Sequence, residues 1–317
     1  SFLSYSVYDK HSVLVTRDGS LLGIGDNSEG RISSSLKNTE ISQFTEFSNK
    51  DKRGRQLTPI SAVCCLWGTL CMFSKSNGSG KQLVYCDCDK NSGYPIYLDI
   101  GDEEPVSLFG GYFHSAAISD KGEVIFINRD TVRNSPISRI AAVSLPDGEK
   151  ASSVACLENS VVVLSSNSRV YSSSFELGSS VIKFSPVSEL NEYEIVWVSG
   201  TYKHCLAVSK EDRVFRLGSN ENGQLGLGKE KEYVFSFTEI SSLLGYEIRA
   251  AYDVCLHSLF ETRERKILSC GYNGCGELLL GNVPSKESIY SPKETVIAEN
   301  ATFCIAGHCL STVFVGG

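Results

Sequence analysis

The chain has 317 residues, and its 37 acidic residues outnumber its 30 basic ones, which gives a formal net charge of −7. This acidic balance argues against binding of duplex nucleic acid through the overall field of the protein, because such binding relies on Lys and Arg near the phosphates. No run of about 18 apolar residues is present, so we expect no membrane partner, and the twelve cysteines lack the spacing of a disulfide framework or a zinc site. We therefore expect a protein of the cytoplasm or nucleus that holds no metal and no cofactor.

Histidines followed by Ser or Cys recur along the chain. They are His11, His114, His204, His257 and His308. Two further segments have the same apolar pattern without a histidine, and we assign Thr69 and Asn159 to the histidine position there. The seven positions are separated by about fifty residues, a spacing that predicts an array of repeated supersecondary units.

Three of the histidines are followed fourteen residues later by the motif Gly-x-Asn-x-x-Gly. The glycines of these motifs are Gly25 and Gly30, Gly218 and Gly223, and Gly271 and Gly276. A turn that is repeated with positive φ selects Gly, and after it Asn, because a Cβ is unfavourable in that region. We interpret the motif as a structural turn and not as a phosphate-binding loop.

Short β-branched or alternating runs surround these motifs. In the clearest copy, between Val196 and Gly228, such runs lie at 194–198, 206–208 and 214–217, and turn-forming residues separate them. Runs of this length with tight turns between them indicate strands, and no copy sustains a helical apolar pattern. We therefore expect an all-β chain.

The histidines themselves have two possible roles. A polar ring at one fixed place in every repeat can hydrogen-bond to neighbouring groups, and a small residue after it allows close packing. The alternative is a metal site, but ligands at the same phase of different repeats would not converge within about 2 Å of one ion. We favour the structural role for all five.

The order of these features resembles the repeat of the regulator of chromosome condensation (RCC) family. The segment GSNENGQLG at 218–226 matches that repeat most specifically, and GDNSEGRIS from Gly25 and GYNGCGELL from Gly271 match it in part. The resemblance implies a single domain over residues 1–317, a seven-bladed β-propeller with mostly four-stranded antiparallel blades. It also implies a last blade, possibly short, that is closed by pairing of the N-terminal SFLSYSVYD with the C-terminal STVFVGG.

The longest departures from the minimal repeat are the places where we expect a binding surface, because loops on a rigid scaffold commonly contact partners. A basic run lies at 50–55, an Arg-bearing segment at 128–150, and a segment at 228–245 carries Tyr233, Phe235 and Phe237. The predicted binding residues are Arg53, Arg55, Arg129 and Arg133. Arginines and aromatic residues contribute strongly to protein interfaces.

Two functions of different classes follow. No nucleophile with an adjacent base is recognisable, so we predict no catalytic residue and a non-enzymatic scaffold that docks a protein partner on one propeller face. The RCC resemblance implies an alternative, guanine nucleotide exchange on a small GTPase. The residues that would perform exchange match no motif of this chain.

Overall fold

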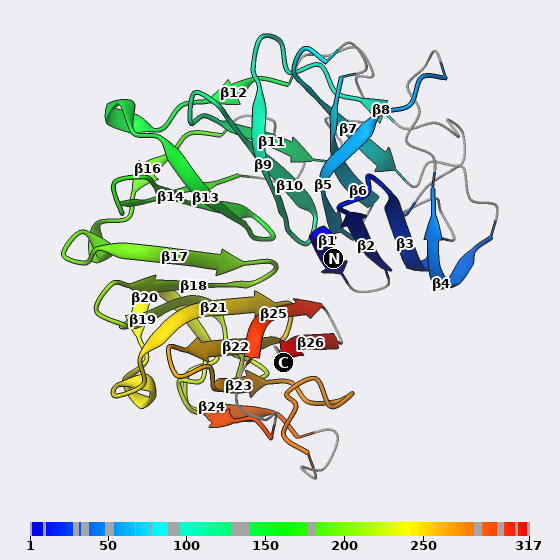
Figure 1. Ribbon diagram of the computed structural model, residues 1–317. Helices are drawn as coiled ribbons and strands as arrows, with labels where there is room; N and C mark the ends of the chain where they lie inside the picture. Colours follow the sequence, from blue (N-terminus) through cyan, green and yellow to red (C-terminus); the bar gives the residue numbers. More distant parts are fainter. Residues whose placement is uncertain are drawn as a thin grey trace. The chain divides into compact units, whose positions relative to one another are not determined.

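The computed structural model describes residues 2–8, 11–27, 32, 38–47, 54–66, 68–75, 78–87, 96–128, 140–175, 182–281, 287–296, 301–307 and 310–315. These residues form six four-stranded sheets and one two-stranded sheet, all antiparallel where the pairing is described (Figure 1). Three 3-10 helices of one turn occur, and the described residues contain no α-helix. The prediction of an all-β chain is confirmed.

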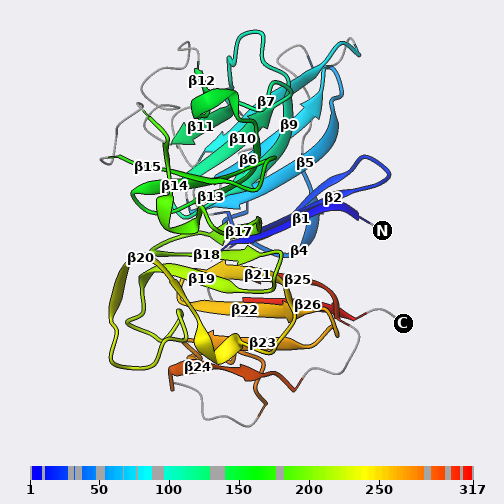
Figure 2. The same ribbon diagram turned by 90° about the vertical axis from the view of Figure 1, so that its left-hand side faces the viewer.

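The chain divides into two compact units, which we describe separately. Unit 1 consists of Ser1–Ala151 and Phe175–Lys183, and unit 2 of Ser152–Ser174 and Phe184–Gly317. Figure 2 shows the succession of strands within each unit from a second direction.

Unit 1 contains three four-stranded sheets. The first is β1 (Phe2–Tyr8), β2 (His11–Thr16), β3 (Leu21–Asp26) and β4 (Glu40–Glu46). The second is β5 (Thr58–Cys65), β6 (Gly68–Ser74), β7 (Lys81–Asp87) and β8 (Ile96–Tyr97), and the third is β9 (Pro105–Gly110), β10 (His114–Ser119), β11 (Val124–Asn128) and β12 (Ala142–Val143). Helix η1 (Pro146–Gly148) follows.

Unit 2 contains three four-stranded sheets and the two-stranded sheet. The first is β13 (Ala151–Cys156), β14 (Ser160–Ser165), β15 (Val170–Ser174) and β16 (Ser185–Pro186). The next two are β17 (Ile195–Gly200), β18 (His204–Ser209), β19 (Val214–Ser219) and β20 (Tyr233–Glu239), then β21 (Ile248–Val254), β22 (His257–Thr262), β23 (Ile267–Gly271) and β24 (Ile289–Glu294). The last sheet is β25 (Ala301–Gly307) and β26 (Leu310–Val315), and the helices are η2 (Ser188–Leu190) and η3 (Ser241–Leu243).

Each four-stranded sheet is a meander with two distinct ends. In four of them the second strand begins at a repeat histidine, and the register places Gly25 opposite His11 and Gly218 opposite His204. We call this the histidine end of a sheet. The opposite end, where a tight turn joins the second and third strands, is the turn end.

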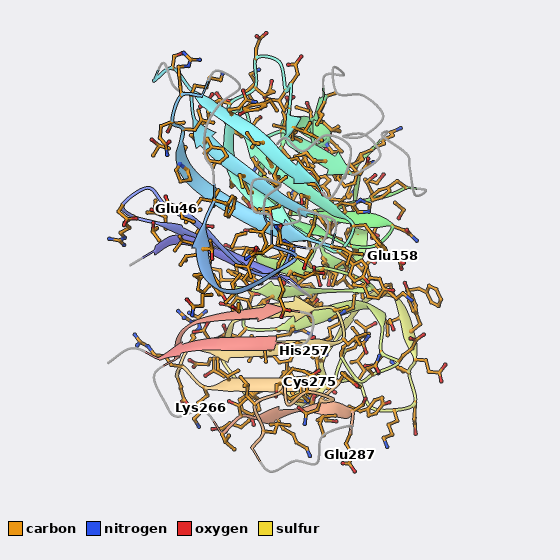
Figure 3. All side chains as sticks on the ribbon, turned by 90° about the vertical axis from the view of Figure 1, so that its right-hand side faces the viewer. Glu46, Glu158, His257, Lys266, Cys275 and Glu287 are labelled. Carbon is orange, nitrogen blue, oxygen red and sulfur yellow. The ribbon has the colours of Figure 1, made fainter. Side chains whose placement is uncertain are left out.

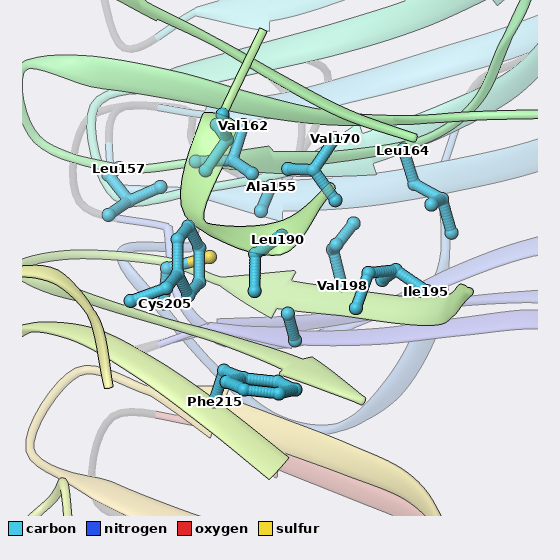
Figure 4. Packing of buried hydrophobic residues seen from close by; sticks show 13 residues of the cluster. Ala155, Leu157, Val162, Leu164, Val170, Leu190, Ile195, Val198, Cys205 and Phe215 are labelled. Atoms are coloured by element: carbon cyan, nitrogen blue, oxygen red, sulfur yellow. The ribbon is translucent and has the colours of Figure 1, made fainter. Parts of the chain in front are cut away.

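Neighbouring sheets within a unit pack face to face, and the cores lie between them. One such core joins the β13–β16 and β17–β20 sheets and includes Leu157, Val162, Val198 and Phe215 (Figure 4). All six residues of β18 are buried, since this strand is covered on both faces by the adjacent sheets. A core of the same kind joins β1–β4 to β5–β8 in unit 1.

The prediction for the last blade is right in one respect and wrong in another. The last sheet is short, with only two described strands. However, β1 pairs with β2 at the edge of a complete four-stranded sheet, and no sheet of the described residues mixes strands from both ends of the chain. Only two residues separate Tyr8 from His11, and such a short connection favours pairing of β1 with its immediate successor.

Candidate functional site

The repeat histidines lie buried at the first positions of second strands. His11, His114, His204 and His257 are each at most 4% exposed, whereas His308 lies outside the described residues. The Nε2 atom of His204 is 3.2 Å from Ser258 Oγ and 3.1 Å from Asp253 Oδ1, both in the next sheet of unit 2. The histidine therefore connects neighbouring sheets.

Ser258, His204 and Asp253 are the residue types of a hydrolytic triad, but their geometry is different. In a triad the carboxylate orients the ring nitrogen that does not face the serine. Here both oxygens approach the same Nε2, and the Nδ1 atom of His204 has no hydrogen-bond partner among the described residues. The serine hydroxyl also lies 2.7 Å from Gln224 O, and all three side chains are at most 2% exposed, so the group is a buried structural network.

The same connection occurs in unit 1, and it corrects our assignment of the degenerate repeats. His11 Nε2 is 3.3 Å from Thr69 Oγ1, so Thr69 takes the place of Ser258. Thr69 is therefore the small residue after the histidine position, and Gly68, the first residue of β6, occupies that position. Likewise Ser160, not Asn159, begins β14 and is equivalent to His204. Both assignments were wrong by one residue.

The Gly-x-Asn-x-x-Gly turns are held by their asparagine. Asn220 donates from Nδ2 to Gly228 O at 2.9 Å and to Lys231 O at 2.7 Å, and its Oδ1 accepts the N–H of Leu225 at 2.9 Å. Asn27 and Asn273 accept the N–H of the residue five positions later in the same way. Those three later residues are Ile32, Leu225 and Leu278, all 0% exposed, and the sequence reasoning missed this anchoring role.

The glycines of these motifs have positive φ where they are described. Gly25, Gly218 and Gly271 have φ values of 108°, 110° and 115°, and Gly223 and Gly276 have φ values of 81° and 82°. A Cβ on Gly218 would lie 2.0 Å from Lys203 O and 2.7 Å from His204 Cα. Gly30 lies outside the described residues.

A groove of about 210 Å³ opens at the histidine end in unit 2. Four short segments line it: the β13–β14 connection with Glu158, the β17–β18 connection with Tyr202 and Lys203, the end of β19 with Glu221 beyond it, and Tyr233 at the start of β20. Figure 3 labels Glu158 at this end and Lys266 at the turn end of the same unit.

Side chains of both charges line the groove. The ammonium of Lys203 lies over the ring of Tyr202, 5.1 Å from its centre. The pKa of Lys203 is raised, most by Tyr202 and then by the carboxylates of Glu158 and Glu221. The groove therefore stabilises positive charge.

Two exposed aromatic side chains continue from the groove along β20. Tyr233 is 50% exposed and Phe235 is 86% exposed, and their ring centres are 4.6 Å apart. We call this pair the aromatic ridge. The ridge lies in the segment at 228–245, which the sequence predicts as a binding surface, and exposed aromatic side chains that cluster together mark interaction sites.

The structure places one of the four predicted binding arginines. Arg55 is exposed and lies three residues before Thr58, which pairs with Ser74 at the turn end of its sheet. Arg53, Arg129 and Arg133 lie outside the described residues. Arg129 directly follows Asn128, which pairs with His114, so the chain leaves β11 at the histidine end of its own sheet. The two arginine pairs thus belong to segments that start at opposite ends.

The buried thiols of unit 2 provide little reactive chemistry near neutral pH. Burial raises the pKa of the Cys205 and Cys270 thiols, which keeps them protonated near neutral pH. Within the described part of the chain, no group of three or more His, Cys, Asp or Glu is arranged to hold a metal ion.

The described residues also contain no helix long and apolar enough to cross a membrane.

Comparison with known sequences gives partial matches. No family model matches the chain. It is 36% identical over 107 residues to the Probable E3 ubiquitin-protein ligase HERC6 of Homo sapiens, which covers 32% of this chain and 10% of that protein. It is 30% identical over 126 residues to the secretion-regulating guanine nucleotide exchange factor of Bos taurus, which covers 38% of this chain and 27% of that protein. The matches thus span a tenth to about a quarter of these relatives.

Comparison with solved structures covers almost the whole chain. Human WBSCR16 superposes with a TM-score of 0.79 at 15% identity, over 100% of this chain and 88% of that one. Yeast RCC1 (Prp20), in its complex with Kap60, gives a TM-score of 0.74 at 12% identity, over 98% of this chain and 78% of that one. At these identities the likeness concerns the fold. Together with the repeated motifs and the partial sequence matches, it shows that the chain resembles the RCC-repeat β-propellers in its repeat motif and in its fold.

Proposed function

We propose that the chain is a non-enzymatic interaction module that docks a protein partner at the histidine end of its sheets. The observation that carries this proposal is the groove of Glu158, Lys203 and Glu221 together with the adjoining aromatic ridge. Aromatic anchors beside a hollow with charged walls are the features that give protein interfaces their affinity and orientation. As part of the proposal, the module acts in the cytoplasm or nucleus.

The proposal includes one domain of seven blades over residues 1–317. Six four-stranded sheets and one two-stranded sheet supply seven repeat units, and the match to WBSCR16 over the full chain supports a single array. Hydrogen exchange of the intact chain tests it, since a single array predicts protection of β18 and β10 that is lost in one transition. Two separate transitions would count against one domain.

The predicted arginines extend the proposed contact in different ways. The segment that carries Arg129 and Arg133 follows Asn128, which lies at the histidine end of its own sheet in unit 1, and the proposal assigns this segment to a contact at that end of unit 1. Arg53 and Arg55 precede β5 at the turn end, so they would serve a second contact. Charge reversal at each pair, measured by association rate against salt, separates these possibilities, because rim charges act mainly on association.

The test of the docking surface uses a matched pair of variants. The ridge variant Tyr233→Ala/Phe235→Ala removes the exposed rings, and the control Leu244→Ala/Tyr246→Ala removes exposed apolar groups, 60% and 39% exposed, before β21. We expect partners captured by the wild-type chain from its native cell extract to be retained by the control and lost by the ridge variant. Equal capture by both variants would show that the ridge is not the docking surface.

Exchange activity is a second candidate function, and a specific similarity favours it. The matched relative from Bos taurus is named as a guanine nucleotide exchange factor, and 38% of this chain aligns with it. If this chain shares that activity, catalytic amounts will accelerate the release of labelled guanine nucleotide from a small GTPase. Release at the intrinsic rate across a panel of GTPases would remove this candidate and leave the docking module.

A further inference from the structure

The groove at the histidine end of unit 2 has a floor that is fixed before any ligand arrives. The N–H of Glu158 donates to Tyr202 O at 2.7 Å, and the N–H of Ser219 donates to Lys203 O at 2.9 Å. The following loop is closed by Asn220, whose N–H donates to Glu232 O at 2.7 Å and whose side chain holds two further carbonyls. A ligand would therefore bind with little ordering of the backbone, which favours affinity.

Two lysine ammonium groups of the chain lie over tyrosine rings at this end of the unit. Lys203 lies over Tyr202, and Lys229 lies over Tyr290 with its Nζ 5.3 Å from the ring centre. Tyr290 in turn donates from its hydroxyl to the carbonyl of Glu221 at 3.0 Å. Electron-rich rings beside carboxylates attract positive charge, and the charge balance of the groove walls, Glu158 and Glu221 against Lys203, is negative.

The remaining wall is Tyr233, whose half-exposed ring faces both the groove and Phe235 along β20. Residues two apart on a strand lie on the same face, about 7 Å from each other, which is also the spacing of alternate side chains in an extended peptide. A basic side chain in the groove would thus place a second side chain of the same segment against Phe235.

We propose that this groove recognises an extended segment of a partner protein through one basic side chain, bound between Tyr202 and Tyr233 and against Glu158 and Glu221, with an apolar side chain of the same segment on the aromatic ridge. The proposal rests on the docking function above and names the chemistry of its partner. Arginine fits better than lysine, because its planar guanidinium stacks on a tyrosine ring while it donates to carboxylates.

An acidic or phosphorylated segment is the competing occupant, and Lys203 distinguishes the two. For a basic ligand Lys203 is a like charge, so its removal strengthens binding. For an anionic ligand Lys203 is the attracting group, so its removal weakens binding. The sign of one substitution therefore separates the two classes of ligand.

The experiment titrates the isotope-labelled full chain with blocked octapeptides and follows amide resonances of the groove. The probes are acetyl-Gly-Ser-Ser-X-Ser-Leu-Ser-Gly-amide with Arg, citrulline or Glu at X. We expect the Arg peptide to bind about fivefold or more tightly than the citrulline peptide at low salt, since citrulline keeps the shape and loses the charge. Glu158→Gln and Glu221→Gln should each weaken the Arg peptide about threefold, and Lys203→Met should strengthen it about twofold.

The controls address folding and position. Glu264→Gln removes a carboxylate that is 74% exposed outside the groove and should leave the affinity unchanged, and thermal melts check that every variant is folded. Equal binding of the Arg and citrulline peptides, preference for the Glu peptide, weaker binding by Lys203→Met, or no binding of any peptide would each overturn the proposal. If the ridge variant still loses its captured partner in that case, the docking function stands and only the basic specificity fails.

Discussion

Two interfaces between neighbouring sheets, one in each unit, are built on the same plan from unequal repeats. In unit 2, His204 meets Ser258 of the next sheet, and in unit 1, His11 meets Thr69 of the next sheet, at 3.2 Å and 3.3 Å. The repeat that carries Ser258 has its own histidine, whereas the repeat that carries Thr69 has Gly68 there. The degenerate repeat thus supplies the hydroxyl that contacts the histidine of the preceding sheet, but it has no histidine of its own.

A second bond between first strands shows the same plan. Ser199 Oγ accepts the N–H of Asp253 at 3.0 Å, and at the equivalent place Ser6 Oγ accepts the N–H of Cys64 at 3.0 Å. The two interfaces differ in the side chain at that point, because Asp253 adds a carboxylate beside the histidine and Cys64 does not. The same hydrogen bond between sheets therefore occurs both in a repeat that has the histidine motif and in one that lacks it.

The largest loss of stability is expected when a side chain is added to the glycine that lies opposite a repeat histidine. Gly218→Val should lower the free energy of unfolding by about 3 kcal/mol or more, because its side chain would meet the backbone of Lys203 and His204 in a left-handed conformation. The control Gly228→Ala also has a positive φ, of 82°, but no heavy atom within 4 Å, so we expect a cost of about 1 kcal/mol. Urea unfolding of both variants gives the difference. Equal costs would mean that close packing against the histidine strand is not the reason for this glycine.

The next test removes the shared hydroxyl. Ser258→Ala and Thr69→Val should each cost about 1–2 kcal/mol, since each leaves a buried histidine nitrogen with one partner fewer. Ser236→Ala, on the exposed side of β20, is the neutral control. If the Thr69→Val chain were as stable as the parent, the Thr69 hydroxyl would not stabilise the interface as the Ser258 hydroxyl is expected to do.

The last test measures the loss of stability at alkaline pH. Burial raises the pKa of Cys64 at the unit 1 interface, of Cys270 at the unit 2 interface, and of Cys205 in the adjacent core between β13–β16 and β17–β20. Above about pH 8.5 the unfolded chain releases thiol protons that the folded chain keeps, so stability falls as pH rises, by up to about 1.4 kcal/mol per pH unit for each thiol. Unfolding free energies between pH 7.5 and 10 measure this slope, which Cys205→Ala should reduce and the exposed Cys275→Ser should not. An unchanged slope in Cys205→Ala would show that this thiol does not contribute.

The sequence predicted the strands and turns well where polar and apolar residues alternate, because the alternation shows which residues share a face of the sheet. It failed by one residue at β6 and β14, and the reason is burial. All but the last residue of GTLCMFS are buried, so this strand has no polar face to show which residues point in which direction. Only the histidine marks the phase in such a strand, and both degenerate repeats lack it.

Other features depend on contacts that no local pattern contains. Arg216 is 0% exposed in β19, with Nη1 3.1 Å from Gln224 O and its guanidinium 4.5 Å from the Phe260 ring centre, and burial lowers its pKa. An arginine in a strand is normally expected to reach solvent. The candidate groove is similar, since its charged residues come from three separate connections. The sequence pointed to Tyr233 and Phe235, but their proximity to Glu158 and Lys203 required the fold.

The hydrogen bonds between sheets have a consequence for how such a chain tolerates change. His204–Ser258 and Ser199–Asp253 join residues 54 positions apart, and His11–Thr69 joins residues 58 positions apart, so each bond reaches one repeat forward. Each repeat is therefore constrained only by contacts with its nearest neighbours. Sequence change in one repeat is limited by the hydrogen bonds that the preceding repeat makes to it, whereas its outward loops are not limited in this way. A family built on this rule can accumulate new surfaces one repeat at a time without redesign of the array.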